Sequence, residues 1–396
     1  MGSRYNSVIK KIAFLFFILA FGMSHVACTN VDPEFDIFAF NKIPSGDDNA
    51  ADPSDPNGGG TIGDNTSGGS AGGPAPYCDA ARIANGPFAN SNEAGIDGLS
   101  EANAFTICTP AQLMAMGADE LSLQKHYVLK QDLDLVSLGV INPLGHGTGS
   151  MFVGQLNGEG HEIRDLYVGT PGVDYVGLFH GIGLSGEVVN VRFKNPNIYG
   201  NTSVGVVAGK SSGGQIRQVS AVNAYVNGSY RTGGLVGENS SAALIADSFF
   251  DGYVWSDNYQ VGGVAGYNGG AEIRRVYVVG QVMSAGGDQV GGVVGYNQFS
   301  SGIVSDSWSR ADVSGVSSSN KVGPIVGLVA VGATVVNSAF DQSSVYENTG
   351  GGAAVNFSHG TGVPQSSYFY SSSSAVFGSW DPAIWFFDEI NHPYLR

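Results

Sequence analysis

The sequence predicts an all-β fold: a right-handed parallel β-helix, or β-solenoid, built of repeats of about 28 residues. Three observations support this prediction. A short glycine-rich motif recurs six times, and an apolar residue follows each copy at a nearly constant distance. The repeats are also rich in residues that favour strands and turns.

The glycine-rich motif is clearest in two neighbouring segments. TGGLVGENSSAALIADSFF occupies residues 232–250, and VGGVAGYNGGAEIRRVYVV begins at residue 261. The closing glycines of the six copies are spaced 28, 28, 29, 29 and 32 residues apart: Gly181, Gly209, Gly237, Gly266, Gly295 and Gly327. A fixed period between about 20 and 50 residues is typical of a solenoid, in which each unit buries its apolar face against its neighbours.

The second landmark is an apolar residue that follows each closing glycine by seven to nine positions, at Val188, Ile216, Ile245, Ile273, Val304 and Val335. Glycines also lie within the apolar runs of the repeats. A glycine costs about 1 kcal/mol inside a helix but is tolerated where strands stack closely, so short strands joined by turns fit better than helices. The outer copies depart from the motif at Val206 and Pro324, which predicts irregular end rungs.

Both ends of the repeat array carry sequences that could close it. Thr109, Pro110 and Gln112 form the pattern of a helix N-terminus, which predicts one short helix over residues 110–116. With strands near 126–135 and 162–168, this helix is expected to cover the open N-terminal edge. At the other end, five large aromatic residues are expected to close a core rather than present a binding face: Trp380, Trp385, Phe386, Phe387 and Tyr394.

The repeats resemble those of the GLUG-motif family, named for the run Gly-Leu-any-Gly that GGLVG reproduces at residues 233–237. Segments upstream, from FTICTPAQLMAM (105–116) to MFVGQLNGEGHEIRDLYV (151–168), look like the module that commonly precedes such repeats. The resemblance covers residues 105–345. It implies a bacterial surface protein, similar to adhesin-like chains and to the non-catalytic region of immunoglobulin A1 protease-type metallopeptidases.

The N-terminus resembles the signal peptide of a bacterial lipoprotein. Three basic residues precede the apolar run IAFLFFILAFGM, which is short for a membrane span. HVAC follows at residues 25–28 and resembles a lipobox, although His25 stands where leucine is usual. We predict that residues 1–27 are a signal peptide and that Cys28 is lipidated. The protein would then be exported and anchored to a membrane, at the outer membrane or cell surface. A plain signal peptide and an uncleaved anchor are the alternatives.

Composition divides the rest of the chain into four parts. Residues 28–76 are rich in Gly, Ser, Pro and Asp and contain eight acidic residues, which predicts a flexible acidic linker. Calcium binding there is the alternative, but the spacing of the Asp residues does not match a known calcium loop. After the linker we expect an N-terminal capping module at 77–175, the GLUG-repeat solenoid at 176–345 and a C-terminal cap at 346–396.

Charge and cysteine content constrain the function class. The chain has 18 basic and 34 acidic residues, a net charge of −16, so it lacks the basic footprint that nucleic-acid binding requires. Besides Cys28, the cysteines are Cys78 and Cys108. In an exported protein we expect these two to form a disulfide bond; two free thiols are the alternative.

No catalytic, metal or cofactor site is predicted. A zinc-protease pattern HExxH begins at His161, but Asp165 stands where its second histidine should be. No Gly-x-Ser-x-Gly nucleophile motif occurs, and the seven histidines show no metal-ligand spacing. Some parallel β-helices are polysaccharide lyases or hydrolases. An enzyme of that class is the alternative if Asp247, Arg275 and Asp306 converge in a cleft.

Tyrosines that follow two of the motif glycines are the candidate partner-binding residues. Tyr267 and Tyr296 lie one repeat apart, so their rings would be about 4.8 Å apart and could stack as a ledge for a sugar or a protein side chain. Packing of the turn is the alternative. The next residues, Asn239, Asn268 and Asn297 in successive copies, are expected to form a structural ladder.

The predicted function is therefore a non-enzymatic surface lipoprotein. It would be an adhesin-like or display scaffold for surface glycan or for a protein of a host or neighbouring cell. A purely structural envelope component is a further alternative.

Overall fold

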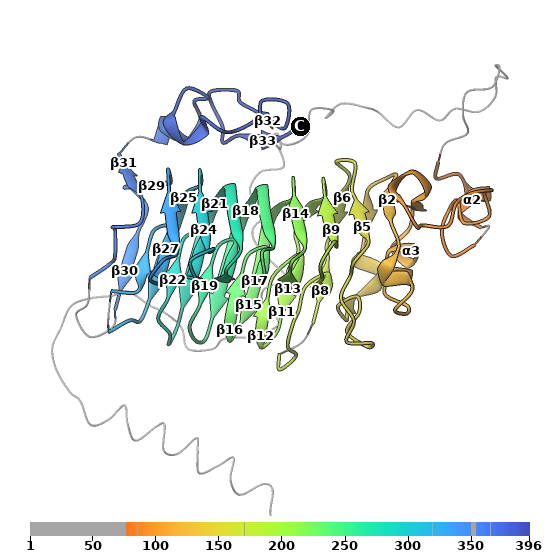
Figure 1. Ribbon diagram of the computed structural model, residues 1–396, viewed down its shortest axis with the longest axis horizontal. Helices are drawn as coiled ribbons and strands as arrows, with labels where there is room; N and C mark the ends of the chain where they lie inside the picture. Colours follow the sequence, from red (N-terminus) through yellow and green to blue (C-terminus); the bar gives the residue numbers. More distant parts are fainter. Residues whose placement is uncertain (1–76, 85, 170, 319, 350–353, 365) are drawn as a thin grey trace, which may run out of the picture. The chain divides into compact units, whose positions relative to one another are not determined.

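The described chain folds into a solenoid of stacked coils (Figure 1). The structure is a computed structural model that describes residues 77–84, 86–169, 171–318, 320–349, 354–364 and 366–396. Within these residues every strand pair is parallel except that of β32 (Trp385–Phe386) with β33 (Tyr394–Leu395). The predicted all-β solenoid is confirmed. The predicted signal peptide, the lipidation site Cys28 and the linker lie outside the described residues.

Each complete coil adds strands to three parallel sheets. One sheet contains β12 (Thr202–Val204), β16 (Tyr230–Gly233), β19 (Val261–Gly262), β22 (Val290–Gly291) and β26 (Val322–Gly323). A second contains β8 (Phe179–Ile182), β13 (Ala208–Ser212), β17 (Val236–Ser240), β20 (Ala265–Gly269), β23 (Val294–Gln298) and β27 (Val326–Val329). The third sheet is the largest and bends twice, so it forms three adjacent faces.

The first face of this large sheet contains β1 (Phe105–Ile107), β2 (Tyr127–Leu129), β5 (Gln155–Asn157), β9 (Glu187–Val189), β14 (Gln215–Arg217), β24 (Ile303–Ser305) and β28 (Thr334–Val336). The second face contains β3 (Leu133–Asp134), β6 (Glu162–Arg164), β10 (Arg192–Lys194), β29 (Ala339–Asp341) and β31 (Thr361–Val363). The third contains β4 (Val140–Ile141), β7 (Tyr167–Val168), β11 (Asn197–Tyr199) and β30 (Tyr346–Asn348). Four long strands run across the bends: β15 (Ser220–Gly228), β18 (Leu244–Ser256), β21 (Glu272–Ser284) and β25 (Trp308–Gly315).

Equivalent residues of the six sequence copies lie in register. The residues that open the copies pair one with the next: Val176, Val204, Thr232, Val261, Val290 and Val322. The second landmarks pair in the same way: Val188, Ile216, Ile245, Ile273, Val304 and Val335. One sequence repeat therefore makes one coil.

The expectation of irregular end rungs was wrong. The Val206 amide donates to Gly234 O at 3.0 Å, and the Val293 amide donates to Ile325 O at 2.9 Å, so both outer rungs keep the regular pattern. Pro324 is tolerated because it follows β26, which is at the edge of its sheet. A proline on an edge removes no rung hydrogen bond.

Residues with left-handed backbone conformation turn the chain between the faces. Asn and Asp adopt this conformation more readily than most residues. At the bend between the first and second faces, a column of corner residues has φ between 44° and 55°: Asn190, Gln218, Asp247, Arg275, Asp306 and Asn337. At the second bend, Asn195 Nδ2 donates to Asp165 Oδ1 at 3.1 Å and Asn223 Nδ2 donates to Asn195 Oδ1 at 2.8 Å. These side chains hold successive coils together at the corners.

Apolar side chains fill the interior, with one polar column among them. Asn239, Asn268 and Asn297 are fully buried. Asn239 Nδ2 donates to Asn268 Oδ1 at 2.9 Å, and Asn268 Nδ2 donates to Asn297 Oδ1 at 2.8 Å. The expected structural ladder is present, because Asn239 and Asn268 each donate to the asparagine of the next coil within the interior.

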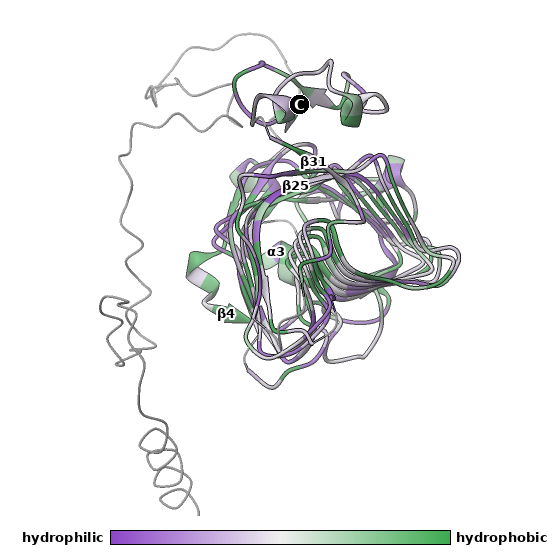
Figure 2. Ribbon diagram, turned by 90° about the vertical axis from the view of Figure 1, so that its left-hand side faces the viewer, coloured by the Kyte–Doolittle hydropathy of each residue, from purple (hydrophilic) through white to green (hydrophobic). Residues whose placement is uncertain are grey.

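Helix α3 (Pro110–Ala115) closes the N-terminal end of the interior (Figure 2). Thr109 Oγ1 accepts the Gln112 amide at 3.2 Å, as the N-cap pattern predicts, and Leu113 and Met116 are fully buried. The strands near 126–135 and 162–168 were also expected to cover the open N-terminal edge of the solenoid, and this expectation was wrong. β2 pairs with β1 and β5, and β6 pairs with β3 and β10, so these strands form the first coils themselves.

The C-terminal residues lie beside the second face, not over the end of the solenoid (Figures 1 and 2). Phe249, Tyr277 and Trp308 stack in register on the outside of that face, with ring centroids 4.6 and 4.3 Å apart. Trp380 and Trp385 pack onto this stack. Trp380, Trp385 and Phe387 thus close a core, but it is a lateral core separate from the interior. Phe386 and Tyr394 are not part of it and pack against each other, with ring centroids 5.0 Å apart. Burying the stack removes a large apolar patch from water.

Candidate binding surface

Tyr267 and Tyr296, the predicted partner-binding residues, do not form a stacked ledge. They pair in register, but their ring centroids are 5.9 Å apart and the ring planes are inclined at 64°. Tyr267 is only 8% exposed, and its hydroxyl donates to Gln298 Oε1 at 2.6 Å. The Arg231 guanidinium lies 4.5 Å from the Tyr267 ring centroid. The two tyrosine rings therefore pack edge to face, and the Tyr267 ring also contacts Arg231.

The carboxylates considered for the enzyme alternative belong to the corner column. Arg275 Nε and Nη2 donate to Asp247 Oδ1 and Oδ2 at 2.7 and 2.6 Å, while Asp306 accepts from Asn337 Nδ2 at 2.6 Å. Trp385 Nε1 donates to Asp247 Oδ1 at 3.3 Å, and Asp247 is only 5% exposed. These contacts hold a structural corner beneath the C-terminal segment. They do not form the open cleft that an acid–base pair would require.

An aromatic strip crosses the third face of the large sheet, and it was not predicted. We define this aromatic strip as Tyr167, Tyr199, Tyr225, Tyr253 and Trp255, which come from β7, β11, β15 and β18. Neighbouring ring centroids are 6.2, 5.5, 5.5 and 6.3 Å apart along the strip. The planes of Tyr225 and Tyr253 are inclined at only 12°, and those of Tyr253 and Trp255 at 10°.

The strip faces outward because its residues alternate with buried ones. Ile198, Val226 and Val254 lie between or beside the strip residues along the strands and are fully buried. Successive side chains of a strand point to opposite sides, so the neighbouring rings point to solvent. All five rings are partly or largely exposed, and Tyr167 is 38% exposed.

Uncharged side chains surround the rings. Asn197, Asn227 and Gln281 pair in register with strip residues on adjacent coils. Burial, with Tyr167 and Tyr225 beside it, raises the pKa of Tyr199 to about 12. Burial and the neighbouring Tyr225 also raise the pKa of Tyr253. The strip therefore offers ring faces, hydroxyls and amides without a formal charge at neutral pH.

The sequence does contain a signal for the strip. AYVNG at residues 224–228 and GYVWS at 252–256 place a tyrosine at the same position of two copies, 28 residues apart. The glycine motif and the second apolar landmark both lie outside this part of the repeat. The glycine motif and the second apolar landmark therefore do not by themselves indicate the strip.

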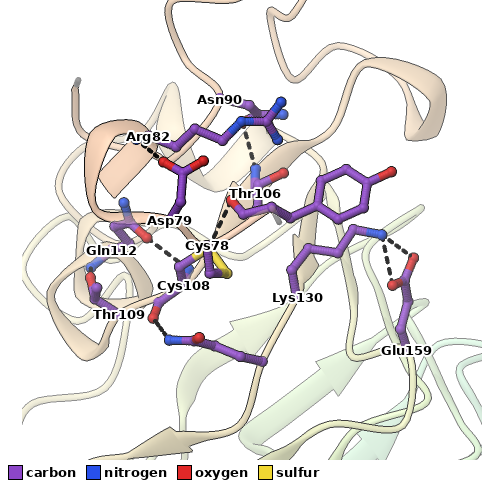
Figure 3. Close-up of a disulfide and its surroundings, with 12 residues drawn as sticks. Cys78, Asp79, Arg82, Asn90, Thr106, Cys108, Thr109, Gln112, Lys130 and Glu159 are labelled. Atoms are coloured by element: carbon purple, nitrogen blue, oxygen red, sulfur yellow. Dashed lines mark hydrogen bonds and ion pairs between the residues drawn. A yellow bond between two sulfur atoms is a disulfide. The ribbon is translucent and has the colours of Figure 1, made fainter. Parts of the chain in front are cut away.

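The predicted disulfide bond between Cys78 and Cys108 is present, with Cα atoms 5.5 Å apart (Figure 3). It joins the segment that contains α2 (Ala80–Ile83) to the residue that follows β1. Among the described residues, no group of three or more His, Cys, Asp and Glu side chains is placed to hold a metal ion. The helices in the described ranges include none that is long and apolar enough to span a membrane.

One repeat matches a known sequence motif. Residues 257–283 match the GLUG motif, and they contain β19, β20 and most of β21, which together make one coil. One coil of the chain therefore carries the GLUG motif. The crystal structure of a candidate immunoglobulin A1 protease from Bacteroides ovatus has a similar fold. Its TM-score is 0.59 at 20% identity, and the match covers 76% of the present chain and 94% of that chain.

Halomucin from Haloquadratum walsbyi is similar in sequence over a limited region. It is 33% identical to the present chain over 143 residues, which is 34% of this chain and 2% of halomucin. The chain thus matches a very small part of that protein. The likeness to the Bacteroides ovatus structure, at 20% identity, is one of fold alone.

Proposed function

We propose that this protein is a non-enzymatic, adhesin-like surface scaffold that binds neutral carbohydrate along the aromatic strip. The observation that carries the proposal is the strip itself. Five rings from four successive coils form one uncharged outer surface on a protein whose net charge is −16. Repeat solenoids commonly use such extended surfaces for binding.

The chemistry of the strip matches that of a sugar chain. Sugar rings have apolar C–H faces and hydroxyl edges. Aromatic ring faces can pack against the C–H faces of a sugar. The hydroxyl edges of the sugar can exchange hydrogen bonds with the tyrosine hydroxyls and with the amides of Asn197 and Asn227. Tyr and Trp lose little conformational entropy on binding, and the sheet already fixes their positions. Since the strip is uncharged, we expect the affinity to depend little on salt.

Changing both Tyr225 and Tyr253 to Ala should weaken binding of the purified protein to neutral polysaccharide at least about tenfold, or 1.4 kcal/mol. Both rings are partly exposed, so the circular dichroism and the melting temperature should change little. Tyr296→Ala is the matched control, because Tyr296 is a partly exposed tyrosine of another sheet. It should bind like the wild type.

Affinity electrophoresis against a panel of neutral and acidic polysaccharides measures this effect. Full binding by the Tyr225→Ala, Tyr253→Ala protein would contradict the proposal. A loss of binding in Tyr296→Ala alone would instead place the partner beside Tyr267 and Tyr296. Binding of acidic polymers alone would also overturn the proposal.

We also propose that the scaffold is exported and held at a membrane by lipid on Cys28. The support is the signal-like N-terminus with its lipobox-like HVAC, together with a disulfide bond, which is typical of exported proteins. Cys28→Ser should release the protein from the membrane fraction and abolish labelling by a palmitate analogue. Cys78→Ser, which leaves Cys28 intact, should still be labelled. Persistent labelling of Cys28→Ser would rule out lipid attachment at this residue.

A further inference from the structure

A cavity of about 500 Å³ opens on the outside of the first coils, beside the disulfide bond. Its floor is the outer surface of β1, β2 and β5, at Thr106, Val128 and Asn157. The disulfide-bonded segment contributes Tyr77 and Arg82 to the lining. Figure 3 shows Arg82 in this segment. The cavity lies over the first face of the large sheet, whereas the aromatic strip lies on the third. Its volume is within the usual range for sites that hold small molecules.

Two cationic side chains line the cavity, Arg82 and Lys130, and each is paired with a carboxylate that also lines it. Lys130 Nζ lies 2.7 Å from both carboxylate oxygens of Glu159, and Arg82 Nη2 lies 3.2 Å from Glu93 Oε1. Both cations also lie over the Tyr77 ring, at 4.7 and 5.6 Å from its centroid. An anionic ligand would therefore have to compete with these carboxylates, which disfavours its binding.

The carboxylates retain capacity to accept hydrogen bonds from a ligand. An ionised carboxylate offers about four acceptor positions and no donor. Glu159 uses its oxygens for Lys130, and Glu101 Oε1 accepts from Gln155 Nε2 at 2.9 Å. The remaining acceptor positions suit a ligand that is rich in hydroxyl donors. We propose that this cavity binds one neutral sugar residue, a hexose, at a site separate from the aromatic strip.

The disulfide bond makes this site dependent on oxidation. α2, which lies in the disulfide-bonded segment, has no buried residue, so little apolar burial holds it in place. The Cys78–Cys108 bond ties this segment to the end of β1. Reduction would free Tyr77 and Arg82 from the floor of the cavity and remove part of its lining. Sugar binding here should therefore require the oxidised protein.

Ligand-observed NMR with the oxidised full chain tests the proposal, with glucose, galactose and mannose as neutral probes and glucuronate as the anionic probe. At least one hexose should bind, and glucuronate should bind at least about tenfold more weakly. Glu159→Gln should weaken hexose binding at least about tenfold. Glu272→Gln, which alters a comparable ion pair with Arg274 at 2.9 Å on β21, should not.

Two further proteins separate this site from the strip and from simple misfolding. The Cys78→Ser, Cys108→Ser protein should lose hexose binding while its β-type circular dichroism is retained. The Tyr225→Ala, Tyr253→Ala protein should still bind hexose in the cavity. Loss of binding at the aromatic strip therefore does not imply loss of binding in the cavity. The proposal is overturned if no hexose binds, if glucuronate binds equally well, or if Glu159→Gln binds like the wild type. It is also overturned if only the strip variant loses hexose binding.

Discussion

Gly262→Val should lower the free energy of unfolding by about 3 kcal/mol or more, a large effect for one substitution. Gly262 pairs with Gly233 and Gly291 on the adjacent coils. A Cβ at this position would lie 2.2 Å from Ala265 O and 2.7 Å from Gly295 N. Both are backbone atoms in the hydrogen-bonded rungs. They cannot move aside without disturbing the coils on either side.

Gly147→Val is the matched control for this effect. Gly147 lies in an exposed turn, and an added Cβ would meet no heavy atom within 4 Å. Urea unfolding of the two variants and the wild type gives the comparison. We expect Gly147→Val to unfold close to the wild type. If Gly262→Val does so too, the repeat glycines only fill turns and close packing between coils does not require them.

Trp385→Ala should detach the C-terminal segment from the second face at a cost of about 3–5 kcal/mol. The Trp385 side chain is fully buried, and its ring centroid lies 4.4 Å from that of Trp380 and 5.9 Å from that of Tyr277. Its Nε1 also donates to Asp247, which is paired with Arg275. Loss of the ring would leave both a cavity in the lateral core and an unfilled position beside the corner.

Limited chymotrypsin digestion followed by mass spectrometry detects this detachment. Trp385→Ala should be cut rapidly within residues 366–396 while the solenoid stays intact. Ile390→Ala is the control, since Ile390 is in the same segment but is 74% exposed. Equal cleavage rates for the two variants would show that Trp385 does not hold the segment in place.

The coils could be predicted from the sequence because stacking repeats the same environment at every turn. A residue that opens one copy must meet its equivalent on the next coil, so spacing in the sequence becomes register in the sheet. The same reasoning identified the Asn239, Asn268 and Asn297 ladder. The helix after Thr109 could be predicted because its capping signal is local.

Features that depend on which side a residue faces could not be predicted in this way. The glycine motif gave no sign that Arg231 would cover the Tyr267 ring, because this contact joins residues from different sheets of neighbouring coils. Nor did the tail reveal that it would lie against Phe249, Tyr277 and Trp308. Aromatic residues that stack on successive coils have the same spacing in the sequence whether they face the interior, a lateral segment or solvent.

Fluorescence of Trp255 tests the carbohydrate-binding account most directly. Of the four tryptophans, Trp308, Trp380 and Trp385 are at most 5% exposed, whereas Trp255 lies partly exposed in the aromatic strip. Acrylamide should therefore quench mainly Trp255. A saturating neutral polysaccharide is expected to protect it from quenching, and Trp255→Phe should abolish that change. Polysaccharide binding that leaves the quenching of Trp255 unaltered would contradict the account.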